Sequence, residues 1–104
     1  MSTPRTRLSQ RQLEALIRRE AATTSNLFFT YHVQQQMRQR RITQACVLDT
    51  LRRGSIKRTP EPNSSKGSVE CRMELFSTGH KIGVIVAVSD EPGLVVVTAM
   101  YLGE

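Results

Sequence analysis

The sequence has little that would tie it to a membrane, a metal ion or a disulfide framework. Its 104 residues include no tryptophan, two cysteines and only 5% aromatic residues. No run of eighteen apolar residues is present, so we expect no transmembrane helix, and the N-terminus lacks the apolar core of a secretory signal. Cys46 and Cys71 form no Cys-x-x-Cys pair, which argues against structural zinc. We therefore expect a cytoplasmic protein without cofactors, in which both thiols are buried.

Length and hydrophobic content indicate one folded domain over residues 1–104. This length is close to the commonest domain size, and 38% hydrophobic residues are enough for a core without cross-links. We divide the chain into a flexible N-terminus (1–8), an additional N-terminal helix (9–22) and a core (27–102). No internal repeat and no second domain is visible.

Acidic residues are scarce, most of all where basic residues gather. The net charge is +6 and the isoelectric point is about 10.2. Between residues 38 and 58 the only acid is Asp49, against seven basic residues: Arg38, Arg40, Arg41, Arg52, Arg53, Lys57 and Arg58. Such a local field favours a polyanion. Phosphate is the first expectation, with anionic lipid or an acidic protein as alternatives, and a solvated basic face as the simplest interpretation.

Helix signals fill the first half of the chain. Ser9 and Gln12 form a capping box before an apolar stripe at helical spacing. Thr30 and Thr43 are suitable N-cap residues for two further helices, and we expect Gly54 to end the last one in the left-handed conformation. The expected helices span residues 9–22, 31–39 and 44–53.

The second half of the chain has the period of β-strands. A short strand at 55–59 and a polar loop at 61–68 precede a strand at 68–77, whose alternation predicts a half-buried surface. Two nearly continuous apolar strands follow at 81–89 and 94–102, with turns expected at Thr78–Gly79 and at 90–93. One strand face carries Val69, Cys71, Met73 and Leu75, and the other carries Glu70, Arg72, Glu74 and Phe76. We expect an α+β fold in which the N-terminal helices pack on the first of these faces, in a sheet of three or four antiparallel strands.

A short ordered motif extends over most of the chain. It consists of F-T-x-H ending at His32, R-x-I-T beginning at Arg40, and V-T-A-M-Y ending at Tyr101. From about Phe28 to Tyr101 the chain resembles a family of small bacterial proteins labelled a domain of unknown function. Members of that family resemble the RelE/ParE/HigB toxins, whose fold is shared with barnase-like and EndoU-like ribonucleases. The resemblance implies a RelE-like core, with the first helix as a variable extension.

The resemblance also implies a site and a reaction. RelE-type toxins cleave RNA without metal, by attack of a ribose 2′-OH on the adjacent phosphate. His32, Arg40, Thr98 and Tyr101 match the motif positions. A histidine exchanges protons near neutral pH, an arginine binds phosphate through two N–H groups, and a tyrosine orients or donates. We therefore predict catalytic roles for His32, Arg40 and Tyr101, and for Glu74 if it shares their cleft.

Each predicted site residue also has a structural interpretation. His32 would bond a strand carbonyl, and Tyr101 would be a core aromatic with its hydroxyl at the rim. Glu70, Arg72 and Glu74 would be cross-strand ion pairs, or else the floor of an open cleft. Strict alternation places Thr98 and Tyr101 on opposite faces unless a bulge intervenes. The residues predicted to bind RNA are Arg38, Arg41, Arg52, Arg53, Lys57, Arg58 and Arg72.

Three hypotheses follow for the function. The first is an endoribonuclease toxin, with RNA as substrate and an antitoxin as partner, in which His32 and Arg40 converge on one phosphodiester. The second is a non-catalytic module that binds RNA, DNA or an acidic protein. The third is a structural partner: the apolar strand at 94–102, if it lay at a sheet edge, would need cover from a homodimer or an antitoxin.

Overall fold

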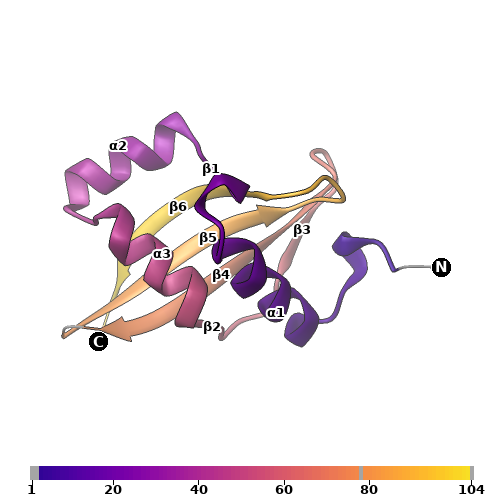
Figure 1. The fold of residues 1–104 in the computed structure, drawn as a ribbon, viewed down its shortest axis with the longest axis horizontal. Coiled ribbons are helices and arrows are strands. Elements are labelled where there is room, and N and C mark those ends of the chain that lie inside the picture. Colours follow the sequence, from indigo (N-terminus) through magenta and orange to yellow (C-terminus); the bar gives the residue numbers. More distant parts are fainter. Residues whose placement is uncertain (1–2, 78, 104) are drawn as a thin grey trace.

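The core of the fold is a mixed β-sheet, seen in a computed structural model that describes residues 3–77 and 79–103 (Figure 1). Its strand order is β1-β6-β5-β4-β2, and β3 pairs with β4 as well. The strands are β1 (Leu27–Phe29), β2 (Ser55–Ile56), β3 (Glu61–Asn63), β4 (Ser68–Ser77), β5 (His80–Val88) and β6 (Leu94–Leu102). The helices are α1 (Gln10–Ala21), α2 (Tyr31–Arg40) and α3 (Gln44–Arg53).

The predicted α+β class is confirmed, whereas the predicted strand number is wrong. The long strands β4, β5 and β6 form the expected antiparallel meander. Three short strands extend it: β1 pairs with β6 in parallel, and β2 and β3 pair antiparallel with β4. A strand of two or three residues is too short to produce a periodic pattern, and its pairing is decided by tertiary contact.

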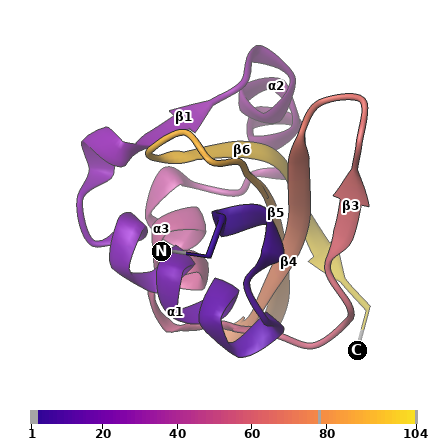
Figure 2. The same cartoon turned by 90° about the vertical axis from the view of Figure 1, so that its right-hand side faces the viewer.

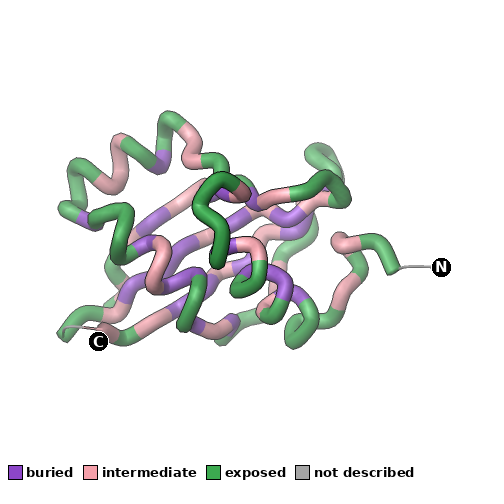
Figure 3. The backbone as a smooth tube through the Cα atoms, in the orientation of Figure 1, coloured by how far each residue is buried: buried purple, intermediate pink, exposed green. Residues whose placement is uncertain are grey.

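Two helices cover one face of the sheet, but the third lies at its edge and not on that face, where we had expected all the N-terminal helices. In Figure 2, α1 and α3 occupy the same side of the sheet, whereas α2 lies beside β6. The covered face carries Val69, Cys71 and Met73 of β4, as predicted, and these side chains are buried. Val47 and Leu51 of α3 are fully buried against it. The helices differ in burial, as Figure 3 illustrates: α2 buries only Val33, whereas α3 buries Val47, Thr50 and Leu51.

The outer edge of β6 is covered by the same chain. The Thr30 N–H donates to the Val96 carbonyl at 3.3 Å, directly after the β1–β6 pairing. Three residues farther along the edge, the Ala99 N–H donates to Gln36 Oε1 at 3.2 Å, and the Ala99 carbonyl accepts from Arg40 Nη1 at 2.7 Å. Side chains of α2 thus extend the cover of the β6 edge that strand β1 begins. From Leu94 to Ala99 the strand is therefore not an open edge, which is the condition from which the structural-partner hypothesis started.

The caps of the three helices are confirmed, but one helix end differs from the prediction. The hydroxyls of Ser9, Thr30 and Thr43 each accept a backbone N–H three residues later. Gly54 ends α3 with an extended backbone, φ −77° and ψ −174°, rather than a left-handed one. A Cβ there would lie 2.4 Å from the Thr50 carbonyl oxygen, so the close approach of chain segments requires the glycine. Among the described residues other than glycine, Arg41 at the end of α2 alone has a positive φ, 56°.

The N-terminal segment makes contacts with the rest of the fold. Residues Arg5–Arg7 form a 3₁₀ turn. The Arg5 guanidinium donates to the carbonyls of Ser89, Glu91 and Gly93, and it pairs with Glu20 at 3.6 Å. The start of the chain is therefore tied to the turn between β5 and β6. The expected turn at Thr78–Gly79 includes Thr78, which lies outside the described residues. Within the described chain, no helix is long and apolar enough to cross a membrane.

Candidate functional site

The histidine of the motif lies on the exposed side of α2, in its first turn. His32 Nε2 is 2.9 Å from the side-chain nitrogen of Gln36, one helical turn later. The Gln36 oxygen is already held by the Ala99 N–H, so its amide nitrogen faces the ring and donates to it. This network assigns the proton of the neutral imidazole to Nδ1. The prediction that His32 would bond a strand carbonyl directly is wrong, because Gln36 stands between them.

Arg40 lies on the same side of α2, two turns beyond His32. Eight residues of helix correspond to about 12 Å along the axis. One nitrogen of its guanidinium donates to the Ala99 carbonyl, and Gln36 holds the N–H of the same residue. We had expected His32 and Arg40 to converge on one phosphodiester. Instead, the two residues are connected indirectly, through Gln36 and Ala99. We call His32, Gln36 and Arg40 the polar row.

Tyr101 lies near the end of β6, two residues beyond the Ala99 carbonyl that holds Arg40. It pairs with Ile82 on the helix-covered face, and its side chain is 45% exposed. Its hydroxyl donates to the Arg41 carbonyl at 3.2 Å. Thr98 pairs with Ile85 and lies on the opposite face, as alternation predicted. The bulge between β5 and β6 comes before Thr98, so it cannot bring the two side chains together.

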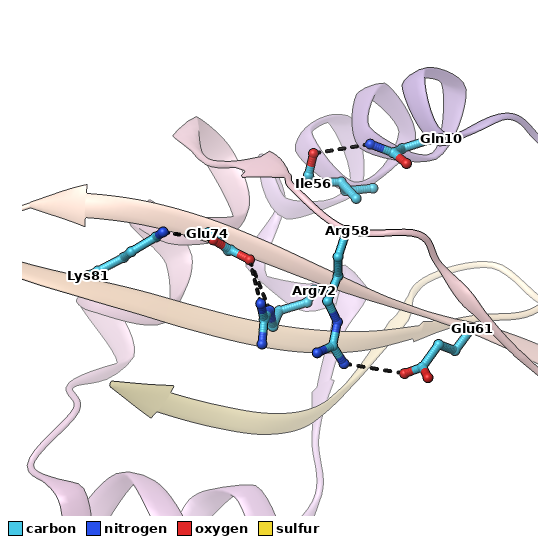
Figure 4. Close-up of polar contacts among 7 residues, drawn as sticks. All are labelled: Gln10, Ile56, Arg58, Glu61, Arg72, Glu74 and Lys81. Atoms are coloured by element: carbon cyan, nitrogen blue, oxygen red, sulfur yellow. Dashed lines mark hydrogen bonds and ion pairs between the residues drawn. The ribbon is translucent and has the colours of Figure 1, made fainter. Parts of the chain in front are cut away.

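Glu74 lies on the sheet face that α1 and α3 leave uncovered. Its side chain is only 3% exposed and forms two ion pairs, with Arg72 at 2.8 Å and with Lys81 at 3.3 Å (Figure 4). A buried carboxylate requires such partners, so the ion-pair interpretation explains its position without a catalytic role. Of the four predicted catalytic residues, Glu74 therefore lies apart on the other sheet face, and the Tyr101 hydroxyl reaches only the backbone beside Arg40.

The predicted RNA-binding residues differ in how available their charges are. Arg52 donates to the Ala21 carbonyl at 2.7 Å, and Arg53 pairs with Asp49 at 3.0 Å. Arg58 pairs with Glu61 at 3.3 Å, as Figure 4 shows, and Arg72 pairs with Glu74. Within residues 3–77 and 79–103, the side chains of Arg38, Arg41 and Lys57 have neither a hydrogen bond nor an ion pair. We call Arg38, Arg40 and Arg41, at the end of α2, the α2 cation cluster.

Two features of this region were missed in the sequence. Gln36 joins the histidine to the strand, and the spacing of four residues from both His32 and Arg40 was the signal that could have revealed it. Cys46 was expected to be buried but is exposed in the first turn of α3. Cys71 is buried as expected, and this burial raises the pKa of its thiol to about 12. The two thiols therefore differ in reactivity.

Comparison with known proteins identifies a family and no individual relative. A family model described as a domain of unknown function (DUF4258) matches residues 29–101, which include the whole polar row and Tyr101. No curated protein and no solved structure matches the chain. Across the part of the chain that the structure describes, no three His, Cys, Asp or Glu side chains gather in a group that could hold a metal ion.

Proposed function

The chain belongs to this DUF4258 family, and from that premise we propose a toxin-like endoribonuclease that cleaves RNA without metal and is controlled by an antitoxin. The general arrangement supports the proposal, because the helices lie on one face and one edge of an antiparallel meander, as in the RelE-like fold that the motif resembles. The observation that carries it is the polar row: an exposed imidazole on the same helix side as an arginine, beside Arg38 and Arg41, whose side chains have no partner among the described residues.

The polar row supplies the groups that are needed for attack by a ribose 2′-OH. His32 Nε2 has its lone pair directed toward Gln36 and can accept the 2′-OH proton once the RNA takes the place of that contact. The 2′ oxygen then bonds to phosphorus, the bond from phosphorus to the 5′ oxygen breaks, and the leaving oxygen takes a proton from solvent. The products are a 2′,3′-cyclic phosphate and a 5′-OH. Arg40 offers its remaining N–H groups to the charge that develops on the phosphate.

Two residues of the original prediction have no part in this step. The Glu74 carboxylate is held by two cations on the uncovered sheet face, and the Tyr101 hydroxyl is bound to the Arg41 carbonyl. The catalytic assignment is therefore reduced to His32 as the base and Arg40 as the phosphate ligand, with Gln36 as the positioning residue between them.

The test is cleavage of RNA in EDTA, with and without ribosomes. We expect His32→Ala to lower the rate about 10²- to 10⁴-fold, as for the loss of one placed proton transfer. Gln39→Ala is the matched control, because this α2 residue is exposed and its side chain makes no hydrogen bond within the described residues. The products should carry 2′,3′-cyclic phosphate ends. If neither the wild type nor the variants cleave under any of these conditions, the enzymatic proposal is wrong.

A second candidate, a non-catalytic RNA-binding module, is favoured by one observation. The acceptor nitrogen of His32 is already occupied by Gln36, which is what a purely structural contact requires. Such a module would bind RNA with an affinity that falls steeply with salt but would leave the RNA intact. It would arrest growth only at stoichiometric expression, whereas an enzyme would do so at low expression and lose the effect with His32→Ala.

A further inference from the structure

A cavity that the proposed reaction does not use lies between α3 and the adjoining ends of β4, β5 and β6. Its volume is about 210 Å³. Apolar side chains of the sheet, Leu75 and Ile82, form part of its lining, and α3 contributes Cys46 and Asp49. A cavity of roughly 150 Å³ holds a benzene molecule and drug-sized ligands need roughly 300 Å³ or more, so this one matches a single planar ring system.

Two aromatic rings also line this cavity and are open to solvent. The rings of His80 and Tyr101 are 5.4 Å apart between centroids and inclined at 60°. Both residues are exposed, on neighbouring strands β5 and β6. Exposed rings of this kind are platforms on which a nucleobase stacks with little dependence on sequence.

A carboxylate from α3 provides a polar group beside these rings. Asp49 Oδ2 pairs with Arg53, while within the described residues its Oδ1 has no hydrogen-bond donor. A carboxylate oxygen accepts a hydrogen bond from an exocyclic amino group, which adenine, cytosine and guanine have and uracil lacks. The lining therefore combines an apolar surface, a stacking surface and one acceptor.

The cavity is connected to the α2 cation cluster. The hydroxyl of Tyr101 donates to the Arg41 carbonyl, and Arg40 donates to Ala99, two residues before Tyr101 on the same sheet face. A base at the His80 and Tyr101 rings would therefore leave its phosphate near guanidinium groups that have N–H groups to offer.

We infer that this cavity is a nucleobase subsite, which takes one amino-bearing base of an RNA strand whose phosphates lie on the α2 cation cluster. The inference rests on the RNA-binding part of the proposed function and is independent of the cleavage step. It adds a base preference, with adenine, cytosine or guanine favoured over uracil, because uracil offers the Asp49 oxygen only its ring N3–H, flanked by two carbonyl oxygens, and no exocyclic amino group.

The two cysteines provide a direct reporter for the cavity. Cys46 lines it and is exposed, whereas Cys71 is buried in the sheet with its pKa raised to about 12. An alkylating agent such as iodoacetamide will therefore modify Cys46 and leave Cys71 intact in the folded protein. The rate at Cys46, followed by mass spectrometry, measures occupancy of the cavity, and an unmodified Cys71 shows that the protein stayed folded.

The experiment compares 2′-O-methyl pentanucleotides of A, C or U with inorganic polyphosphate. The methyl groups prevent attack by the 2′-OH, so the result does not depend on cleavage. We expect the A and C oligomers to slow Cys46 alkylation, the U oligomer to do so less, and polyphosphate to bind without protecting. Tyr101→Ala should weaken protection about 5- to 150-fold, the equivalent of one lost stacking contact, whereas Tyr101→Phe keeps the ring and the protection.

The outcomes separate this inference from the proposed function. If the oligomers bind, as followed by fluorescence anisotropy, but Cys46 reacts at an unchanged rate, the subsite is wrong and RNA binding stands. Equal protection by polyphosphate, or full protection in Tyr101→Ala, would likewise overturn it. If neither the oligomers nor polyphosphate bind, both the subsite and the RNA-binding proposal are wrong. If the wild type cleaves RNA, His32→Ala does not, and Cys46 is still not protected, only the subsite is wrong.

Discussion

Helices α2 and α3 look alike in the sequence and differ in what they do in the fold. Each has ten residues, a threonine cap and arginines in its last turn. Helix α3 buries Val47 and Leu51 completely, and its arginines bind the chain's own carbonyl and carboxylate groups. Helix α2 buries one residue, and polar side chains attach it to the edge of β6. A count of basic residues therefore overestimates the charge that is available to a ligand.

The largest expected difference between the helices is in core packing. Leu51→Ala on α3 should lower the free energy of unfolding by about 2–5 kcal/mol, because a cavity is left among fully buried neighbours. Met37→Ala on α2 should cost less, since Met37 is only partly buried against the core. Urea denaturation of both variants measures this, and an equal or larger loss for Met37→Ala would show that α2 is a core helix after all.

The polar attachment of α2 should contribute a smaller but measurable amount. Gln36→Ala leaves the N–H of the buried Ala99 without its acceptor, which we expect to cost about 1–3 kcal/mol. Gln39→Ala is the control on the same helix, with the same change in helix propensity and no side-chain hydrogen bond lost within the described residues. Should the two variants unfold at the same urea concentration, Gln36 does not hold α2 to β6.

Alkaline pH should destabilise the sheet through Cys71. Its thiol has a pKa of about 12 when folded, against an ordinary value of 9.0. Between these values the unfolded chain loses this proton and the folded chain keeps it, so stability falls as pH rises above about 9. The free energy of unfolding should fall with pH more steeply than in Cys71→Ala, by at most about 1.4 kcal/mol per pH unit. Parallel stability curves of the two proteins from pH 8 to 10 would contradict this.

The elements set by local patterns were predictable from the sequence. The capping hydroxyls of Ser9, Thr30 and Thr43 begin three helices where expected, and alternation gave the buried face of β4. The apolar run at 27–29 suggested a brief strand or an extended lead-in, but its parallel pairing was not predictable, because its partner β6 is 67 residues away in sequence (Leu27 with Leu94). The extended backbone of Gly54 depends on the approach of Thr50 and Glu74 carbonyls, which only the fold reveals.

The candidate site was predictable in composition and not in arrangement. The motif picked out His32 and Arg40, which do share one side of α2. Whether an arginine side chain is available to a ligand depends on which groups of the chain fold against it. Arg52, for example, is held by the carbonyl of Ala21, which lies 31 residues earlier in the sequence. Exposure of Cys46 likewise depends on how the end of the sheet meets α3, where a cavity remains.

The salt dependence of RNA affinity in two double variants tests the comparison of the helices most directly. Arg38→Gln with Arg41→Gln removes the two free charges of α2, and Arg52→Gln with Arg53→Gln removes the two bound charges of α3. We predict that the α2 variant lowers the slope of log affinity against log salt by about 1.4, as for two lost phosphate contacts on single-stranded RNA, while the α3 variant keeps the wild-type slope. An unchanged slope in the α2 variant, with the loss appearing in the α3 variant, would contradict the account.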